Sequence, residues 1–162
     1  SIRRQRQMCI RDRAKPTTMK KRGSLMEYSE ERMQSIMRVY DDYVSSCNYI
    51  NITYICKQIS TMPSPRFWVS SVWASKMMYA MFKGSQFENM LPSKREMFQE
   101  IFRRVKELRK THSDWTIKKC CKVVVEQPAP KYYLTEESIK VMICKEKKRR
   151  FEERKKRLRH CF

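Results

Sequence analysis

Glycine is scarce in this sequence: only 2 of the 162 residues are glycine, and 6 are proline. Tight hairpin turns and phosphate-wrapping loops depend on glycine, because it adopts left-handed backbone conformations without strain. So low a content argues against β-hairpin architectures and against glycine-rich nucleotide loops. Since 41% of the residues are hydrophobic, the chain can still form a core, and we expect an all-α fold.

Long apolar runs are also missing. No stretch approaches the roughly 18 apolar residues of a membrane span, and the basic start is not followed by the apolar segment of a secretory signal. We therefore expect no membrane partner and a cytoplasmic location. Without export, the seven cysteines are interpreted as free, buried thiols, because disulfides persist mainly in oxidising compartments.

Motifs of catalysis and metal binding are absent as well. The sequence contains no dinucleotide-binding loop, no phosphate-binding loop, no zincin helix and no nucleophile elbow. Cys120 and Cys121 with His112, or His160 with Cys161, are the nearest approach to a zinc-ligand set, but they lack the paired spacing of such sites. We expect no enzyme activity, no catalytic residue, no metal and no cofactor.

Acidic residues are few: 17 Asp and Glu stand against 37 Lys and Arg, a formal net charge of +20. Such an excess repels itself in a compact protein and is most useful against a polyanion, either nucleic acid or an anionic membrane surface. It is densest between Lys145 and Arg159, where ten Lys and Arg accompany three Glu. A helix of this composition would follow phosphates without reading the base sequence.

The first 13 residues, SIRRQRQMCIRDR, show neither a helical apolar stripe nor a helix cap. The string QRQMCIRDR resembles translated sequencing-adapter DNA, and we exclude it from the fold. Residues 14–27 are polar and basic and are interpreted as a flexible arm. Residues 1–27 are therefore an adapter artefact plus a flexible basic arm, and the rest of the chain remains strongly basic without them.

An internal repeat organises the remaining chain. Residues 63–70 read PSPRFWVS and residues 128–135 read PAPKYYLT, an offset of 65. At this offset residues 28–84 align with residues 93–149 without a gap, and the apolar positions coincide. The repeat predicts these segments: a first unit at 28–84, a linker at 85–92, a second unit at 93–149 and a basic helical tail at 150–162.

Each unit is predicted to contain three helices. Apolar residues at spacings of three and four mark the first helix of both copies: Met33, Ile36, Met37, Tyr40 and Tyr43, matched by Phe98, Ile101, Phe102, Val105 and Leu108. The prolines of each repeated motif end the second helix. Ser70 and Thr135 are then candidate N-caps of the third helix, and Ser93 with Glu96 predicts a capping box at the start of the second unit.

Helix, helix, rigid turn, helix is the order found in helix-turn-helix proteins, whose last helix lies in the DNA major groove. We therefore expect an all-α fold of two tandem three-helix units that are helix-turn-helix-like, the second ending in a long basic helix. The connection from Pro63 to Val69 is about seven residues, longer than the three or four of the usual turn. The geometry can therefore differ from that of a groove-reading unit.

Cations at the predicted turns, on the third helices and at the start of the tail are the candidate nucleic-acid contacts. They are Arg66, Lys76, Lys131, Lys140, Lys145, Lys147, Lys148, Arg149 and Arg150. A second interpretation stays open for Arg66 and Lys131, because a cation beside an aromatic residue can stack on the ring or cap the preceding helix. The neighbouring aromatic residues are expected to pack beneath the turn rather than to stack on bases: Phe67, Trp68, Tyr132 and Tyr133.

The segments PSPRFW and PAPKYY resemble the P-A-P-[RK]-[FY]-[FY] segment of uncharacterised small basic repeat proteins from phages and mobile elements of gut bacteria. The resemblance covers residues 28–162 and implies a phage or mobile-element context inside a bacterial host cell, but no activity. We predict a non-catalytic nucleic-acid-binding protein whose partner is double-stranded DNA. Two alternatives stay open: a phage structural or protein-interaction module, and RNA or general polyanion binding through the tail alone.

Overall fold

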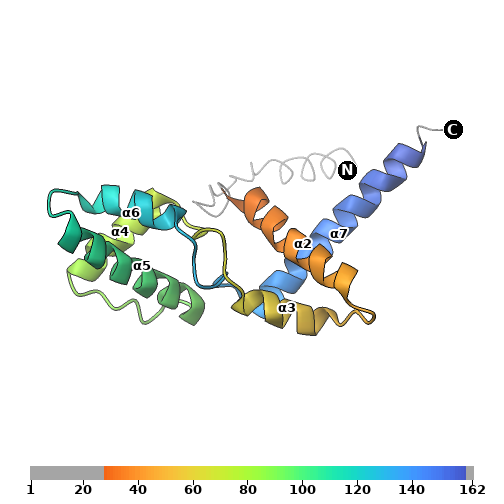
Figure 1. The fold of residues 1–162 in the computed structure, drawn as a ribbon, viewed down its shortest axis with the longest axis horizontal. Coiled ribbons are helices and arrows are strands. Elements are labelled where there is room, and N and C mark those ends of the chain that lie inside the picture. The colour runs from red at the N-terminus through yellow and green to blue at the C-terminus, as the bar shows by residue number, and fades with distance from the viewer. Residues whose placement is uncertain (1–27, 160–162) are drawn as a thin grey trace, which may run out of the picture.

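A computed structural model of the protein describes residues 28–159, and the predicted N-terminal segment 1–27 lies outside them. The described chain is all-helical and forms no strand, which confirms the predicted fold class. Six helices follow one another (Figure 1): α2 (Ser29–Ser46), α3 (Ile52–Thr61), α4 (Ser71–Phe82), α5 (Pro92–Thr111), α6 (Ile117–Glu126) and α7 (Glu136–Arg159). None of these helices combines the length and the apolar character needed to cross a bilayer.

Short polar side chains begin most of the helices. Ser70 accepts a hydrogen bond from the backbone N–H of Trp73 at the start of α4, and Thr135 accepts one from Ser138 at the start of α7. Both predicted caps of the third helices are therefore confirmed. The predicted capping box at Ser93 is wrong, because α5 begins one residue earlier with Pro92 at its first turn and has no side-chain cap.

The third helix of each copy packs against the first two helices of the other copy. α4 contacts α5 and α6, whereas α7 contacts α2 and α3, and within residues 28–159 α4 has no contact with α2 or α3. Figure 1 shows the result as two three-helix bundles side by side, one built from α2, α3 and α7 and the other from α4, α5 and α6. The tandem units at 28–84 and 93–149 are thus repeats of sequence, but they are not the units that pack.

The two linkers that carry this exchange touch at the repeated Pro-x-Pro motifs. Ser64 and Ala129 each donate a backbone hydrogen bond of 2.9 Å to the carbonyl oxygen of the other, in antiparallel orientation. Proline has no N–H, so the middle residue of each motif is the one able to donate. Both middle residues are small and almost fully buried, which explains why the repeated motif has a small residue between its prolines.

The aromatic residues after each motif enter the cores of the two bundles. Phe67 and Tyr133 are buried in the α4–α5–α6 core, where their rings stack with centroids 6.1 Å apart. Tyr132 is buried in the α2–α3–α7 core and its hydroxyl is hydrogen-bonded to that of Ser35 at 2.6 Å. Trp68 is partly buried against the same core. The prediction that these aromatic residues pack beneath the turn is confirmed.

α7 extends well beyond the bundle to which it belongs. Its buried positions end at Glu146, and residues 151–159 are exposed without exception. In Figure 1 this last part of α7 projects away from α2 and α3 as a free-standing helix. The predicted boundary between the second unit and the tail falls inside this one continuous helix.

Candidate nucleic-acid interface

The nine predicted contact residues fall in three separate places: the crossing linkers, the outer face of α4, and α7. α4 and α7 belong to different bundles and do not contact each other in the described chain. The two helices that flank each linker also lie in different bundles, so they do not pack as the two helices of a helix-turn-helix do. The helix-turn-helix-like arrangement expected from helix order is therefore not formed by α3 with α4 or by α6 with α7.

The two linker cations have partners inside the protein. Arg66 lies 3.9 Å from the carboxylate of Glu31 and 4.1 Å from the centroid of the Tyr28 ring. Lys131 lies 2.6 Å from the carboxylate of Glu96. Glu31 and Glu96 are themselves 65 residues apart, so the ion pair is repeated in both copies. These contacts favour the structural interpretation of the two cations over phosphate binding.

Lys131 also lies 5.5 Å from the centroid of the Tyr133 ring.

Lys76 differs from both linker cations, because it is exposed on α4 and no carboxylate of the described chain lies within ion-pair distance. Its bundle separates it from Lys140 and Lys145 on α7. The structure therefore does not gather the predicted cations of α4 and α7 into one surface.

On α7, the cations nearest the bundle are held by carboxylates. Arg149 donates hydrogen bonds to both carboxylate oxygens of Glu146, and Arg150 donates to one of the same oxygens. Arg149 also binds Glu153. Arg150 reaches across to Asp41 on α2 at 2.9 Å. The hydrogen bond from Arg149, followed by that from Arg150, holds the pKa of Glu146 below its usual range. Of these ion pairs, the one between Arg150 and Asp41 joins α7 to α2, and the others lie within α7.

Lys147 adds a further tie to α2. Its ammonium donates a hydrogen bond of 3.3 Å to the Tyr40 hydroxyl and lies 5.6 Å from the centre of that ring. Lys140, Lys145 and Lys148 are exposed on the same helix, with no carboxylate of residues 28–159 at ion-pair distance. Of the six predicted α7 contacts, Lys147 and Arg150 thus reach α2, Arg149 pairs with carboxylates of α7 itself, and the other three face solvent.

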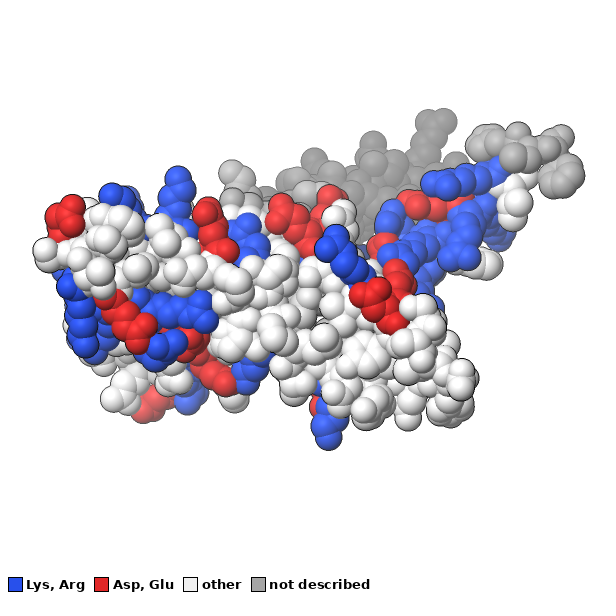
Figure 2. All heavy atoms as spheres, viewed as in Figure 1, with Lys and Arg blue, Asp and Glu red and all other residues white. Residues whose placement is uncertain are grey.

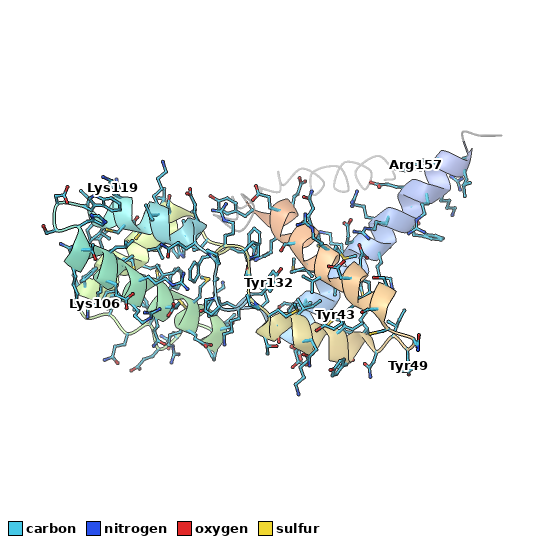
Figure 3. All side chains as sticks on the ribbon, in the orientation of Figure 1. Tyr43, Tyr49, Lys106, Lys119, Tyr132 and Arg157 are labelled. Carbon is cyan, nitrogen blue, oxygen red and sulfur yellow. The ribbon has the colours of Figure 1, made fainter. Side chains whose placement is uncertain are left out.

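Beyond the bundle, α7 presents five cations that belong to the basic segment Lys145–Arg159 but are not among the nine predicted contacts. They are Arg154, Lys155, Lys156, Arg157 and Arg159. All five are exposed, and none has an ion-pair partner in the part of the chain that the structure describes. Figure 2 shows this projecting end covered largely in blue, and Figure 3 labels Arg157 on it.

A sequence signal could have distinguished some of the free cations from the engaged ones. Glu146 precedes Arg149 and Arg150 by three and four residues, and Glu153 follows Arg149 by four, the spacings at which helical side chains meet. Arg149 and Arg150 are therefore the cations that local spacing would pair. Arg154 and Arg159 have no carboxylate at those spacings, whereas Lys155, Lys156 and Arg157 have Glu152 or Glu153 there and are still unpaired in the structure. Local spacing therefore separates the two sets only in part, and the exposure of the later cations depends on where the bundle ends.

The directions of the free cations follow from helix geometry. Successive residues of an α-helix are rotated by about 100°, so the consecutive residues Arg154 to Arg157 point in four different directions. Phe151 and Leu158 are the exposed apolar residues of this segment, and at a spacing of seven they lie on one side. The projecting helix therefore carries cations on most of its sides, with the exposed Glu152 and Glu153 between them.

A second basic surface lies at the far end of the other bundle, where α5 ends and α6 begins. Three cations there lie over aromatic rings: Lys119 over Trp115 at 4.2 Å, Lys106 over Phe102 at 5.0 Å, and Arg109 over Phe82 at 5.5 Å. Figure 3 labels Lys106 and Lys119 at the end of the molecule opposite to Arg157, and blue atoms are dense there in Figure 2.

The buried thiols and the one described histidine are held in packed surroundings, whereas Cys47 and Cys144 are exposed. Burial raises the pKa of Cys121 to about 11, so this thiol stays protonated at neutral pH. His112 stacks on Trp115, with ring centroids 4.2 Å apart. No group of three or more His, Cys, Asp or Glu within residues 28–159 is arranged to hold a metal ion. What the arrangement offers chemically is positive charge on projecting surfaces.

Comparison of the chain with protein-family models, with curated proteins and with solved structures found no match. The function must therefore be argued from the residues themselves.

Proposed function

We propose that this protein binds double-stranded DNA without catalysis, through the projecting end of α7, residues 151–159. The observation that carries the proposal is the ring of exposed cations without ion-pair partners on a helix that stands free of its bundle. The ion pair between Arg150 and Asp41 connects the base of that projecting segment to α2. A phage or mobile-element setting in a bacterial host cell is part of the same proposal.

The distribution of the charges favours a duplex groove over a flat anionic surface. The major groove of B-DNA is wide enough for an α-helix, and phosphates then line it on both sides. Cations on the two flanks of the helix then lie near phosphates, and those that face the floor of the groove lie near base edges. On a membrane surface, half of them would face away from the lipid, and Phe151 and Leu158 alone would provide the apolar contact that such helices need.

The composition of the segment favours binding with little sequence preference. Lysine and arginine contacts to phosphate supply affinity but carry no base information. Residues 151–159 contain no Asn or Gln, the side chains that pair bidentately with adenine, so guanine, which arginine and lysine can bind, is the base that the cations of this segment could read. Each phosphate contact releases counterions, so affinity should fall steeply with salt, by about 0.9 in log–log slope per contact.

The test is duplex binding by two matched fourfold variants. R154Q/K155Q/K156Q/R157Q removes four cations of the projecting helix, and K57Q/K76Q/K83Q/K122Q removes the same charge from exposed lysines elsewhere. We expect the first to lower duplex affinity at least a hundredfold at about 100 mM salt and to reduce the salt slope by about 3 to 4. The second should change affinity less than tenfold. Equal effects of the two variants would contradict the proposal.

A protein-interaction role is a second candidate, and one observation favours it. Val72, Trp73 and Tyr79 form an exposed apolar strip along the outer face of α4, and clustered exposed apolar side chains often mark binding surfaces. A partner that co-purifies after nuclease treatment and is lost in the V72S/Y79S variant would support this role. Unchanged DNA binding by the same variant would separate it from the first proposal.

A further inference from the structure

A small aromatic pocket lies where the two copies of the repeat meet, between the start of α2, the start of α5 and the second linker. Its volume is about 110 Å³. Several of its lining residues are equivalent pairs at the offset of 65: Trp68 with Tyr133, Val69 with Leu134, and Arg32 with Met97. The exchange of helices between the copies therefore creates this pocket, and it is unrelated to the projecting end of α7.

The walls of the pocket are aromatic and positively charged. Five aromatic side chains line it: Trp68, Trp73, Phe98, Tyr132 and Tyr133. Phe98, Tyr132 and Tyr133 are core residues at most 7% exposed, so the partly buried Trp68 and the exposed Trp73 offer the open ring surface. The charged lining residues are Arg32 and Lys94, and no carboxylate is among the lining residues. A site with aromatic faces and positively charged donors is complementary to a planar ring that carries negative charge.

Two buried donors in this pocket have no acceptor. The Nε of Arg32 and the indole Nε1 of Trp68 are both shielded from solvent, and no acceptor in the described chain lies within hydrogen-bond distance of either. Burial lowers the pKa of Arg32, which means that its charge is desolvated. A buried donor left unpaired costs about 1–3 kcal/mol, so a ligand acceptor here would recover binding energy.

The backbone of the pocket shows a further sign of a special site. Tyr133 has a φ of 54°, in the left-handed region that tyrosine rarely adopts, and its equivalent Trp68 does not share it. Such strain is concentrated at binding and catalytic sites. A wider cleft of about 490 Å³ adjoins the pocket and shares Arg32, Lys94, Tyr133 and Leu134 with it. Glu137 is the one carboxylate along that cleft.

We propose that this pocket and the adjoining cleft together bind a nucleotide. The pocket of about 110 Å³ is smaller than the roughly 300–1,000 Å³ of most ligand sites, so it receives the planar base, and the phosphate lies in the cleft beside Arg32 and Lys94, which line both spaces. The same chemistry is offered by a free nucleotide and by an unpaired residue of a single-stranded nucleic acid. The proposal rests on different residues from those of α7, so it stands or fails independently of duplex binding.

The three tryptophan indole N–H groups provide the measurement. In ¹⁵N-labelled protein, AMP should shift the signals of Trp68 and Trp73 saturably, while Trp115, at the far end of α6, stays unchanged. Adenosine, which lacks the phosphate, should bind at least tenfold more weakly, and inorganic phosphate alone should leave the signals in place. The oligonucleotide dA10 serves as the second source: the same shifts with dA10 at lower concentration identify a strand residue, and shifts with AMP alone identify a free nucleotide.

Variants decide whether the pocket is responsible. Arg32→Gln and Lys94→Gln should each weaken AMP binding at least tenfold, whereas the matched control Lys76→Gln and the fourfold α7 variant should leave it unchanged. The indole N–H spectrum of each variant without ligand shows whether that variant is folded. If one pocket variant does not fold, the other still provides the test. No shift with AMP or dA10 up to about 10 mM, or equal AMP binding by Arg32→Gln, Lys94→Gln and the unmodified protein, would overturn the proposal.

Discussion

Ser64 and Ala129, which occupy the same place in the two copies of the repeat, are hydrogen-bonded to each other through both backbone N–H and C=O groups at 2.9 Å. This pair marks the point at which the two linkers cross and each copy passes its third helix to the other. A crossing of small, buried residues leaves no room for larger side chains, and several consequences of the exchange can be measured.

Enlarging the crossing should destabilise the whole fold. Ala129→Leu places a larger side chain where Ala129 is 2% exposed, and overpacking of this kind costs about 1–3 kcal/mol. Urea unfolding followed by circular dichroism measures the free energy of unfolding. Thr53→Leu, at an exposed position of α3, is the control and should change it by less than about 0.5 kcal/mol. If the two variants had the same free energy of unfolding, the linkers would not be in tight contact at Ala129, and the prediction would be wrong.

Cutting the chain between the two copies should leave a stable complex. Residues 24–86 contain α2, α3 and α4, and residues 87–162 contain α5, α6 and α7, so each bundle needs helices from both pieces. Co-expressed pieces should elute together at the size of the intact protein and show its helical spectrum, as measured by size-exclusion chromatography with light scattering. A folded, monomeric 24–86 fragment on its own would contradict the exchange.

The Glu100 cluster should make stability depend on acid pH. Hydrogen bonds from Arg103, together with those from Arg104, lower the pKa of Glu100 to about 2. Because the folded pKa lies below that of the unfolded chain, the stabilisation is complete above about pH 4.5 and is lost as the pH falls toward 2. Arg103 is exposed, so solvent screening reduces the effect to about 1 kcal/mol.

The measurement for this cluster is the free energy of unfolding at pH 5 and at pH 2.5. The unmodified protein should lose about 1 kcal/mol more than Glu100→Gln over this range. Glu107→Gln, which removes a more exposed partner of Arg103, should behave like the unmodified protein. An identical pH dependence of Glu100→Gln and the unmodified protein would show that the ion pairs contribute nothing in solution.

Thiol reactivity should separate the cysteines into two classes. Cys47 and Cys144 are exposed, whereas Cys56, Cys120 and Cys121 are buried. Burial also raises the pKa values of the buried three, which lowers their thiolate fraction. In a fragment of residues 24–160, two thiols should react quickly with a disulfide reagent at pH 8 and three only on unfolding. Rapid reaction of a third thiol would indicate that a bundle opens readily.

The local structure of the chain could be predicted because it depends on local interactions. Apolar residues at spacings of three and four define a helix wherever they occur, and a hydroxyl side chain before a helix caps it regardless of what the helix later packs against. The motif PSPRFWVS predicted both the end of one helix and an N-cap at Ser70 for the next, and the structure has both. Even the failure at Ser93 is local, since Pro92 begins α5 one residue earlier.

The candidate site was only partly accessible from the sequence. The cations of α7 could be located by composition, but the bond from Arg150 to Asp41 joins residues 109 apart in the chain. The partners of Arg66 and Lys131, and the unpaired donors of Arg32 and Trp68, likewise depend on how distant segments meet. No pattern of neighbouring residues reports such contacts.

The sequence by itself determined the helices, their caps, the repeat and the basic end of α7. Which helices pack together was decided only in three dimensions. Because the two copies have matching apolar stripes, the third helix of one fits the first two helices of either copy, and local pattern cannot distinguish these arrangements. The linkers are paired at Ser64 and Ala129 in the arrangement that forms, in which each third helix packs in the other bundle.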